Sequence, residues 1–483
     1  MPAATAPTPI LAAAAAPAPP RTVRLWLWLP LTPLAVLLAP FALLVAPFVW
    51  LALPRRTSNP YALALAVGGV LLSLAGSWVE AGAFGYVVLL LGGSAATLGI
   101  IGFLNTIPNL VFALPAGVLA DHFDRRKILL LFQGGNMGVA IALAVLWATG
   151  DLTVFLMGLL AFTGGTLGAL SFPAFQSMLA GTVPQKDLES AVALNSLALQ
   201  IARFVGPAIA GVLLASAGPT WVFGLNAVSF LGVLGALVLL PSSRAKIASV
   251  SVGVRGAMAD GIRYVFGQRS LASLMMLMVF AGMFATPPVA FMVPGLVRFQ
   301  LHEGPETLGI LISLIGLGSV LGSVALLVLS RRPNKGEPSL VCYLLCAAAI
   351  AIIGISTSVP LSFALALIGG FTGVVFIGLS TVVVQAASSE EMRSRAMAIW
   401  AAAFVGVLPI GALVTAGLAA WLGAGGAVAV DGTITLLGGL GVLLWRPEVR
   451  WLGCAALPEA CVAATDPASF AYLEEEVEAA KAA

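Results

Sequence analysis

The residues in this sequence that could do chemistry are three ionisable side chains inside long apolar runs. Glu80 lies within "SWVEAGAF", Arg203 lies within "QIARFVGP", and Asp431 follows "GGAVAV". A charge in an apolar, lipid-like interior is costly and usually serves a function. A carboxylate in such a place suits a group that binds and releases a proton.

Glu80 and Arg203 are therefore the candidate residues for proton coupling. Arg203 is either the partner of Glu80 or a counter-charge for an anionic substrate. Each residue has a simpler alternative: Glu80 could reach the aqueous interface, and Arg203 could make a structural hydrogen bond. We expect Asp431 to be interfacial rather than functional, because it stands early in its apolar run.

The composition is that of a membrane protein. Of 483 residues, 60% are hydrophobic and 9% are charged, against about 25% charged residues in ordinary soluble domains. The mean hydropathy is +1.06 and the net charge is +3. Apolar stretches of about twenty residues recur along the chain, which is the length that crosses a hydrocarbon core as a helix. The sequence predicts an all-α polytopic membrane protein.

Several classes of site are excluded by the residue counts. The four cysteines form no CxxC pair and the chain has only two histidines, which argues against a metal site. The nucleotide-binding pattern GxxxxGK[ST] is absent, and we expect no cofactor. No end of an apolar run gathers the paired carboxylates or His/Asp cluster that a membrane-embedded enzyme needs. We therefore expect no enzyme.

Twelve membrane spans are predicted, in two groups of six. The expected spans are 61–90, 98–120, 128–149, 153–180, 189–216 and 219–241, then 271–297, 306–330, 339–357, 360–387, 393–422 and 425–445. "TLGI" opens both the second and the eighth span, and a basic turn follows each of these spans. Two related six-helix halves are typical of secondary transporters, with the substrate site between the halves near the midplane.

The positions of lysine and arginine predict the orientation. Nearly all of them fall in loops on one side of the twelve spans, and only Arg298 falls on the other, so both ends of the core should be cytoplasmic. The expected domains are a low-complexity and then proline-interrupted apolar extension (1–54), a six-helix half (55–241), a basic cytoplasmic linker (242–270), a second six-helix half (271–445) and an acidic cytoplasmic tail (446–483). Residues 25–54 could instead form an extra membrane segment.

A cluster of charged residues lies between the second and third spans, in "GVLADHFDRRK" at 117–127. Six of the seven residues from Asp121 to Lys127 are ionisable. The preceding stretch from Gly82 to Ala120 contains no Asp, Glu, Lys, Arg or His. The bases alone could enforce topology, but the spacing also fixes a carboxylate relative to a glycine and to the bases. We expect Gly117 to let the second span approach a neighbour closely.

This stretch resembles the loop-2/3 signature of the major facilitator superfamily. The matching residues are Gly117, Asp121, Asp124, Arg125, Arg126 and Lys127. The resemblance covers residues 55–445, and "SFPAFQSMLAGTVPQKDLESAVALNSLALQIARFVGPAIAGVLL" (171–214) is similar to the branch of enterobactin and macrolide exporters. It implies a major facilitator fold, with Asp121 in a latch that holds the halves together on the cytoplasmic side. The second half lacks the corresponding aspartate, so one such latch is expected.

The fifth span carries a second motif. Gly206 and Pro207 followed by Gly211 resemble the antiporter signature of the superfamily, which implies export rather than import. Proline bends a helix and glycines permit tight packing, so these residues should form a sealed seam. Ordinary helix packing is the alternative.

Polar residues in other spans should line a weakly polar cavity. The candidates are Trp78, Asn105, Asn109, Gln176, Asn195, Gln200, Asn226, Gln385 and Trp400. For each one, a contact between helices is an alternative to a contact with substrate. We expect a monomeric secondary active transporter in a bacterial plasma membrane that exports an amphipathic small molecule, such as a drug, macrolide or siderophore, by proton antiport. A membrane-embedded enzyme and a non-transporting sensor are the alternatives, and nucleic acid is not an expected partner.

Overall fold

The computed structural model describes the backbone of residues 60–182, 188–239, 254–332, 334–389 and 391–446. Within these ranges it describes all side chains except those of residues 60–71, 113, 114, 118, 121, 179–182, 188–198, 239 and 254–259. The predicted extension (1–54) and all but the first residue of the predicted acidic tail (446–483) lie outside the described residues.

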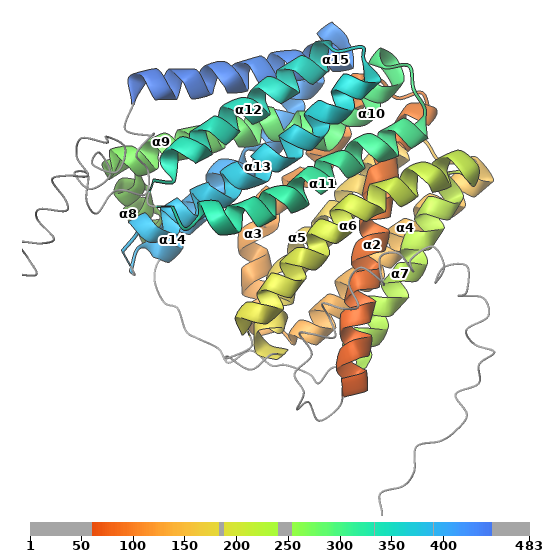
Figure 1. Cartoon of the computed structure of the whole chain (residues 1–483). Coiled ribbons are helices and arrows are strands. Elements are labelled where there is room, and N and C mark those ends of the chain that lie inside the picture. The colour runs from red at the N-terminus through yellow and green to blue at the C-terminus, as the bar shows by residue number, and fades with distance from the viewer. Residues whose placement is uncertain (1–59, 183–187, 240–253, 333, 390, 447–483) are drawn as a thin grey trace, which may run out of the picture.

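The regular structure of these described ranges is helical throughout (Figure 1). The first half contains α2 (Pro60–Leu90), α3 (Ala95–His122), α4 (Arg125–Thr149), α5 (Val154–Thr182), α6 (Leu188–Ser216) and α7 (Pro219–Leu239). A short helix, α8 (Val254–Gly267), precedes the second half. The second half contains α9 (Arg269–Phe280), η4 (Ala281–Ala285), η5 (Pro288–Met292), α10 (Val293–Gly295), η6 (Leu296–Gln300), α11 (Pro305–Leu329), α12 (Gly336–Ile355), α13 (Val359–Ala387), α14 (Arg393–Ala401), η7 (Ala402–Gly406) and α15 (Leu408–Trp445).

The membrane-spanning segments agree with two groups of six. Within the described ranges, 11 helical stretches are long and apolar enough to cross a membrane, and the last of them, Arg393–Trp445, has 53 residues. At 1.5 Å per residue that stretch is about 80 Å long, more than twice the thickness of a hydrocarbon core. Gly423, with φ 72°, breaks it into two rods. Counting both rods gives the twelve crossings expected from the sequence.

The seventh crossing is an irregular helix that runs from α9 to η6. Its three π-helical segments lie around Pro287, Pro288 and Pro294. Proline has no backbone N–H to donate, so the regular hydrogen-bond ladder is interrupted there and wider turns replace it. This irregular helix contributes Phe291 and Pro294 to the space between the halves.

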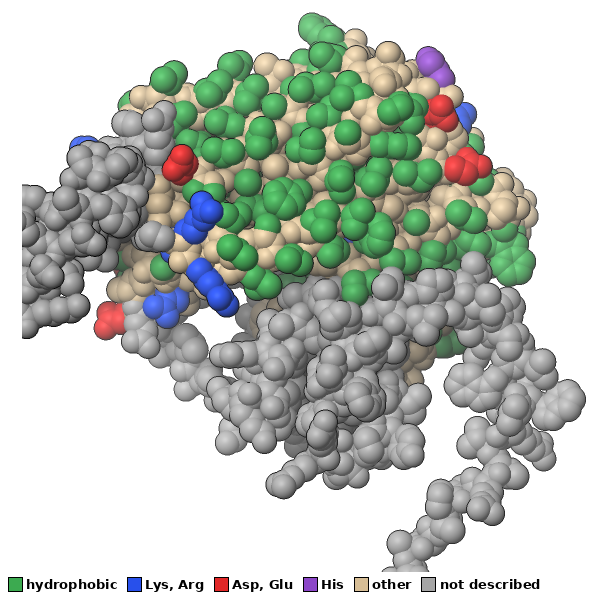
Figure 2. Space-filling view, in the orientation of Figure 1, with side chains coloured by type: hydrophobic (Ala, Val, Ile, Leu, Met, Phe, Trp, Pro, Cys, Tyr) green, Lys and Arg blue, Asp and Glu red, His purple; other side chains and the backbone are tan. Residues whose placement is uncertain are grey.

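Charged residues mark two ends of the molecule. One end, here called the basic face, carries the described residues Arg125, Arg126, Lys127, Arg263, Arg269, Arg331, Arg332, Lys335, Arg393, Arg395 and Arg446. The other end, here called the opposite face, carries Arg298, His302, Glu303 and Glu306. Between the two ends, hydrophobic side chains cover most of the visible surface of the second half, as a bilayer requires (Figure 2).

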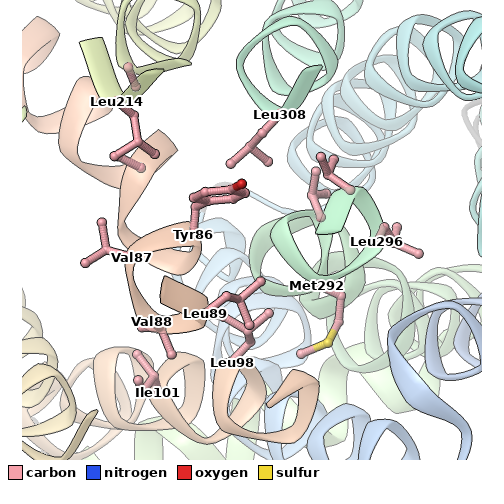
Figure 3. Close-up of a cluster of buried hydrophobic side chains, with 14 of the residues drawn as sticks. Tyr86, Val87, Val88, Leu89, Leu98, Ile101, Leu214, Met292, Leu296 and Leu308 are labelled. Carbon is pink, nitrogen blue, oxygen red and sulfur yellow. The ribbon is translucent and has the colours of Figure 1, made fainter. Parts of the chain in front are cut away.

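The two halves are joined at the opposite face and diverge toward the basic face (Figure 1). One apolar core near the opposite face is built from both halves and includes Tyr86, Leu98, Leu214, Met292, Leu296 and Leu308 (Figure 3). Toward the basic face, each half has a core of its own. Ile128, Leu129 and Phe230 belong to the core of the first half, and Leu274, Val383 and Ala396 belong to that of the second.

Close contacts at two glycines seal the joined end. A Cβ on Gly85 would lie 2.8 Å from Cγ of Pro294, and one on Gly295 would lie 3.2 Å from Cδ1 of Leu98. Arg298 adds a contact between the halves, because its guanidinium carbon lies 5.7 Å from the ring centre of Tyr86. Spaces between the halves are therefore closed at the opposite face.

Gly211→Val should loosen this seal. A Cβ at position 211 would already lie 2.7 Å from the carbonyl oxygen of Pro305 and 2.9 Å from Cα of Gly309, so α6 must move away from α11. Leu308→Cys, in a background without the four native cysteines, reports on the shared core. We expect a membrane-impermeant maleimide to label this cysteine severalfold faster in the Gly211→Val variant. Gly224→Val is the matched control, because an added Cβ there meets nothing within 4 Å. Equal labelling in both variants would show that the seam does not hold the seal.

Candidate functional site

Glu80 lies on α2 and is held by a chain of hydrogen bonds from α7. The amide Nδ2 of Asn226 donates to Oε2 of Glu80 at 2.6 Å. The hydroxyl of Ser229 lies 2.7 Å from the carbonyl oxygen of Asn226 and 3.2 Å from its side-chain oxygen. Asn226 and Ser229 are both buried. Because Ser229 occupies the amide oxygen, the amide nitrogen of Asn226 faces the carboxylate.

Gly76 makes room for this arrangement. A Cβ at position 76 would lie 2.1 Å from the hydroxyl oxygen of Ser229 and 2.9 Å from the side-chain oxygen of Asn226. α2 therefore approaches α7 one turn before Glu80 only because residue 76 has no side chain. Sequence reasoning named neither Gly76 nor Ser229, since a glycine and a serine are ordinary residues in membrane helices.

Glu80 and Asn226 line a cavity of about 520 Å³ between the halves. Its polar lining also includes Ser73, Ser77, Asn105, Gln133, Asn136 and Ser171, and its aromatic lining consists of Phe84, Phe172, Phe175, Phe230 and Phe291. The contact of Gly85 with Pro294 bounds the cavity toward the opposite face, and the lining continues toward the basic face as far as Phe175 and Val233. Rings with a few polar groups are the usual lining of a site for an amphipathic small molecule.

Arg203 is not paired with Glu80. The partner of Glu80 is Asn226, whereas the guanidinium carbon of Arg203 lies 5.6 Å from the ring centre of Trp78. Arg203 lines a second cavity of about 260 Å³, whose other lining residues all come from the second half. The expected pairing of the two residues is therefore wrong, and each serves a different cavity.

Asp431 is not interfacial. It is 0% exposed, and the hydroxyl of Thr415 donates to its Oδ2 at 2.6 Å. Its Oδ1 has no hydrogen-bond partner. The prediction failed because Gly423 starts the last span and Asp431 follows two turns later, where α15 packs against α12.

The predicted cavity residues are divided among different environments. Asn105 and Asn226 line the larger cavity, and Asn105 also donates to the carbonyl oxygen of Ala161. Gln200 instead links the halves, since its amide lies 3.3 Å from the hydroxyl of Ser323 on α11. Neither of the two described cavities is lined by Trp78, Asn109, Gln176, Gln385 or Trp400. The side chain of Asn195 lies outside the described residues.

Gln133 and Asn136 on α4 were missed. They lie three residues apart and so share a helix face, which is a signal that the sequence contained. Trp400 has a structural contact instead of the expected one, because its indole nitrogen lies 3.4 Å from the hydroxyl of Ser380.

The loop-2/3 motif contacts its own half at the basic face. Asp124 caps α4 by accepting a hydrogen bond from the backbone N–H of Arg126 at 3.0 Å. Arg125 donates to the carbonyl oxygen of Ser177, and Arg126 donates to that of Val238 at 2.6 Å. Lys127 is exposed, and the side chain of Asp121 lies outside the described residues. A Cβ on Gly117 would meet nothing within 4 Å, so the close approach expected at this glycine is not made in this conformation.

The arginines at the start of α14, on the other side of the space between the halves, also contact neighbouring residues on their own side. Arg393 donates to the carbonyl oxygen of Gln385, and Arg395 lies 3.4 Å from the carboxylate of Asp260 on α8. Within the described residues of the basic face, these contacts leave the halves unlinked.

The motif of the fifth span lies at a tight crossing. A Cβ on Gly206 would lie 2.6 Å from Cβ of Trp78, and one on Gly82 would lie 2.9 Å from Cα of Pro207. On the other side of α6, Gly211 meets Gly309 of α11. α6 is therefore packed against both α2 and α11, which is the geometry expected of a seam.

Gly76→Ala should disturb the site without touching the carboxylate. The added methyl displaces Ser229, which frees the amide of Asn226 to rotate away from Glu80. We expect substrate transport to fall by about tenfold, the effect of losing one hydrogen bond to a charged group. Gly138→Ala on α4 is the control, since its Cβ would meet nothing within 4 Å. Unchanged transport with equal protein in the membrane would mean that the Ser229–Asn226 pair does not orient Glu80.

Comparisons with known proteins assign the family. The profile of a family described as transmembrane secretion effector matches residues 64–455. The chain is 25% identical over 366 residues to the multidrug efflux pump Tap of Mycobacterium tuberculosis, covering 74% of this chain and 87% of that protein. It is 26% identical over 343 residues to the enterobactin exporter EntS of Shigella flexneri, covering 69% of this chain and 79% of that protein.

A solved structure agrees on the fold. The chain superposes on the crystal structure of a D-xylose-proton symporter with a TM-score of 0.63 at 15% identity, over 80% of this chain and 98% of that one. The predicted all-α fold and the predicted superfamily are confirmed, and the chain is a multi-pass transporter rather than an enzyme. It belongs to the transmembrane secretion effector family, in the multidrug and enterobactin exporter branch of the major facilitator superfamily.

Proposed function

We propose that this efflux transporter exports an amphipathic small molecule, of the drug, macrolide or siderophore class, in exchange for protons. The observation that carries the proposal is the position of Glu80, a single carboxylate in the wall of a cavity between the halves that five phenylalanines also line. The relatives named above support the direction of transport and the kind of substrate.

Exchange follows from competition for one group. The Glu80 carboxylate accepts one hydrogen bond from Asn226 on one oxygen, which leaves its other oxygen available to the cavity. A proton and a polar or cationic group of a substrate would both bind there, and each would displace the other. Such competition is the elementary requirement of antiport, because the site then binds either the proton or the substrate but not both at once.

The distribution of charge supports a cytoplasmic position for the basic face. Eleven described lysines and arginines lie there and Arg298 lies at the other end, which is the asymmetry of the positive-inside rule. In that orientation the cavity is closed toward the outside of a bacterial inner membrane and extends toward the cytoplasm, where an exporter takes up its substrate. One chain contains both halves, so a monomer suffices.

Outward opening requires the basic faces of the halves to come together. The loop-2/3 motif would then meet the start of α14, where Arg393 and Arg395 stand at the positive end of a helix. Asp121 is the proposed acidic partner in that latch. A stabilisation of about 1.4 kcal/mol would change the balance of the two states tenfold.

Glu80→Gln should abolish proton-driven transport while leaving exchange of substrate intact. The amide keeps the volume of the side chain and an acceptor oxygen for Asn226, but it cannot release a proton. Reconstituted protein would be assayed for ethidium and for a panel of amphipathic compounds, first with an imposed pH gradient and then by counter-flow. Glu337→Gln, which alters an exposed carboxylate at the start of α12, is the control. Gradient-driven transport by the Glu80→Gln variant would remove Glu80 from the coupling mechanism.

A further inference from the structure

The second cavity contains a charge that the proposed proton exchange does not use. It is enclosed by η4, η5, α11, α12, α13, η7 and α15 of the second half, and Arg203 of α6 enters it from the first half. Among the described residues that line it, Arg203 is the one with a charge. Arg203 lies near the middle of α6, far from either charged end of the molecule.

The guanidinium of Arg203 has no acceptor among the described residues. Its contact is with the face of Trp78, which satisfies none of its five N–H donors. Among the described residues, neither carboxylate inside the bundle contacts Arg203: Glu80 accepts from Asn226 and Asp431 accepts from Thr415. An unpaired cation inside a membrane bundle is costly, so a partner that arrives from outside the chain would be strongly favoured.

The other polar groups of this cavity are already satisfied. Tyr343 donates to the carbonyl oxygen of Thr435, and the hydroxyls of Thr286 and Ser319 donate to backbone carbonyl oxygens of their own helices. The thiol of Cys346 lies 3.7 Å from the carbonyl oxygen of Gly369. Arg203 is therefore the donor that remains for a ligand, and the rest of the lining offers apolar surface.

Size and chemistry together identify the ligand class. The cavity has about 260 Å³, and a cavity of about 150 Å³ holds a benzene molecule. A planar guanidinium binds a planar carboxylate through two parallel hydrogen bonds. The geometry points to a subsite for a small aromatic anion, in which Arg203 binds an aryl carboxylate or an equivalent acidic group of the exported molecule.

This inference rests on the proposed function, because it assigns Arg203 to the substrate rather than to the proton. It divides the work between the cavities: Glu80 exchanges the proton in one, and Arg203 selects an acidic ring in the other. Molecules that carry both an aromatic acid and a larger amphipathic body would use both.

Binding of benzoate to the purified full-length protein in detergent tests the subsite. Benzamide has nearly the same shape without the charge, and we expect it to bind at least about tenfold more weakly than benzoate. Arg203→Gln should weaken benzoate binding by a similar factor, and Arg203→Lys, which keeps the charge but not the fork, should weaken it less. Arg332→Gln is the control, because this exposed cation lies at the basic face and lines neither cavity.

A second variant keeps the test independent of the folding of the Arg203 variants. Gly369→Leu fills the cavity, since a Cβ there meets its nearest neighbour only at 4.0 Å, and it should abolish benzoate binding with Arg203 intact. Glu80→Gln should still bind benzoate, which separates this inference from the proton mechanism. Equal affinity for benzoate and benzamide, or benzoate binding that survives both Arg203→Gln and Gly369→Leu, would overturn it.

Discussion

The cost of keeping a carboxylate inside an apolar helical bundle is the constraint on which the site depends. Glu80 can remain there because Asn226 donates to it, and Asn226 faces it because Ser229 occupies the other end of the amide. Ser229 in turn has its place because Gly76 has no side chain. The Glu80 carboxylate is thus held by neighbouring side chains on two helices that belong to the same half. That support leaves Glu80 free to respond to what enters the cavity between the halves.

The proposed transport cycle requires the halves to separate and rejoin, and the distribution of the apolar cores is compatible with that movement. Near the opposite face one core is shared, with Tyr86 and Leu98 packed against Met292 and Leu296. Toward the basic face each half is stabilised by its own core, so opening there exposes little that the fold needs. Arg125, Arg126, Arg393 and Arg395 all bind within their own half in this conformation. These residues are thus available for exchange of partners when the basic face closes.

Much of the fold could be predicted from the sequence, because membrane spans depend on composition and length alone. The helices, the two groups of six and the position of Glu80 within an apolar helix needed no knowledge of contacts. The predictions that failed depended on how each helix is rotated about its axis and how deep it lies in the bundle. Arg203 faces the second half rather than Glu80. Asp431 is buried because Gly423 shifts the start of the last span. A Cβ on Gly117 would meet nothing within 4 Å, so the close approach expected there is not made in this structure. Periodicity cannot supply such information, since a helix that is apolar on all sides gives no sign of which side faces its partner.

The central claim is that a proton and the substrate compete for Glu80. The most direct measurement is the uptake or release of protons by purified protein in weakly buffered detergent solution when a substrate is added. The substrate would be one identified in the transport assay with reconstituted protein. Substrate binding should release protons from the unmodified protein and none from the Glu80→Gln variant, while both bind the substrate. Equal proton release by the two proteins, or binding without release by the unmodified protein, would contradict the account.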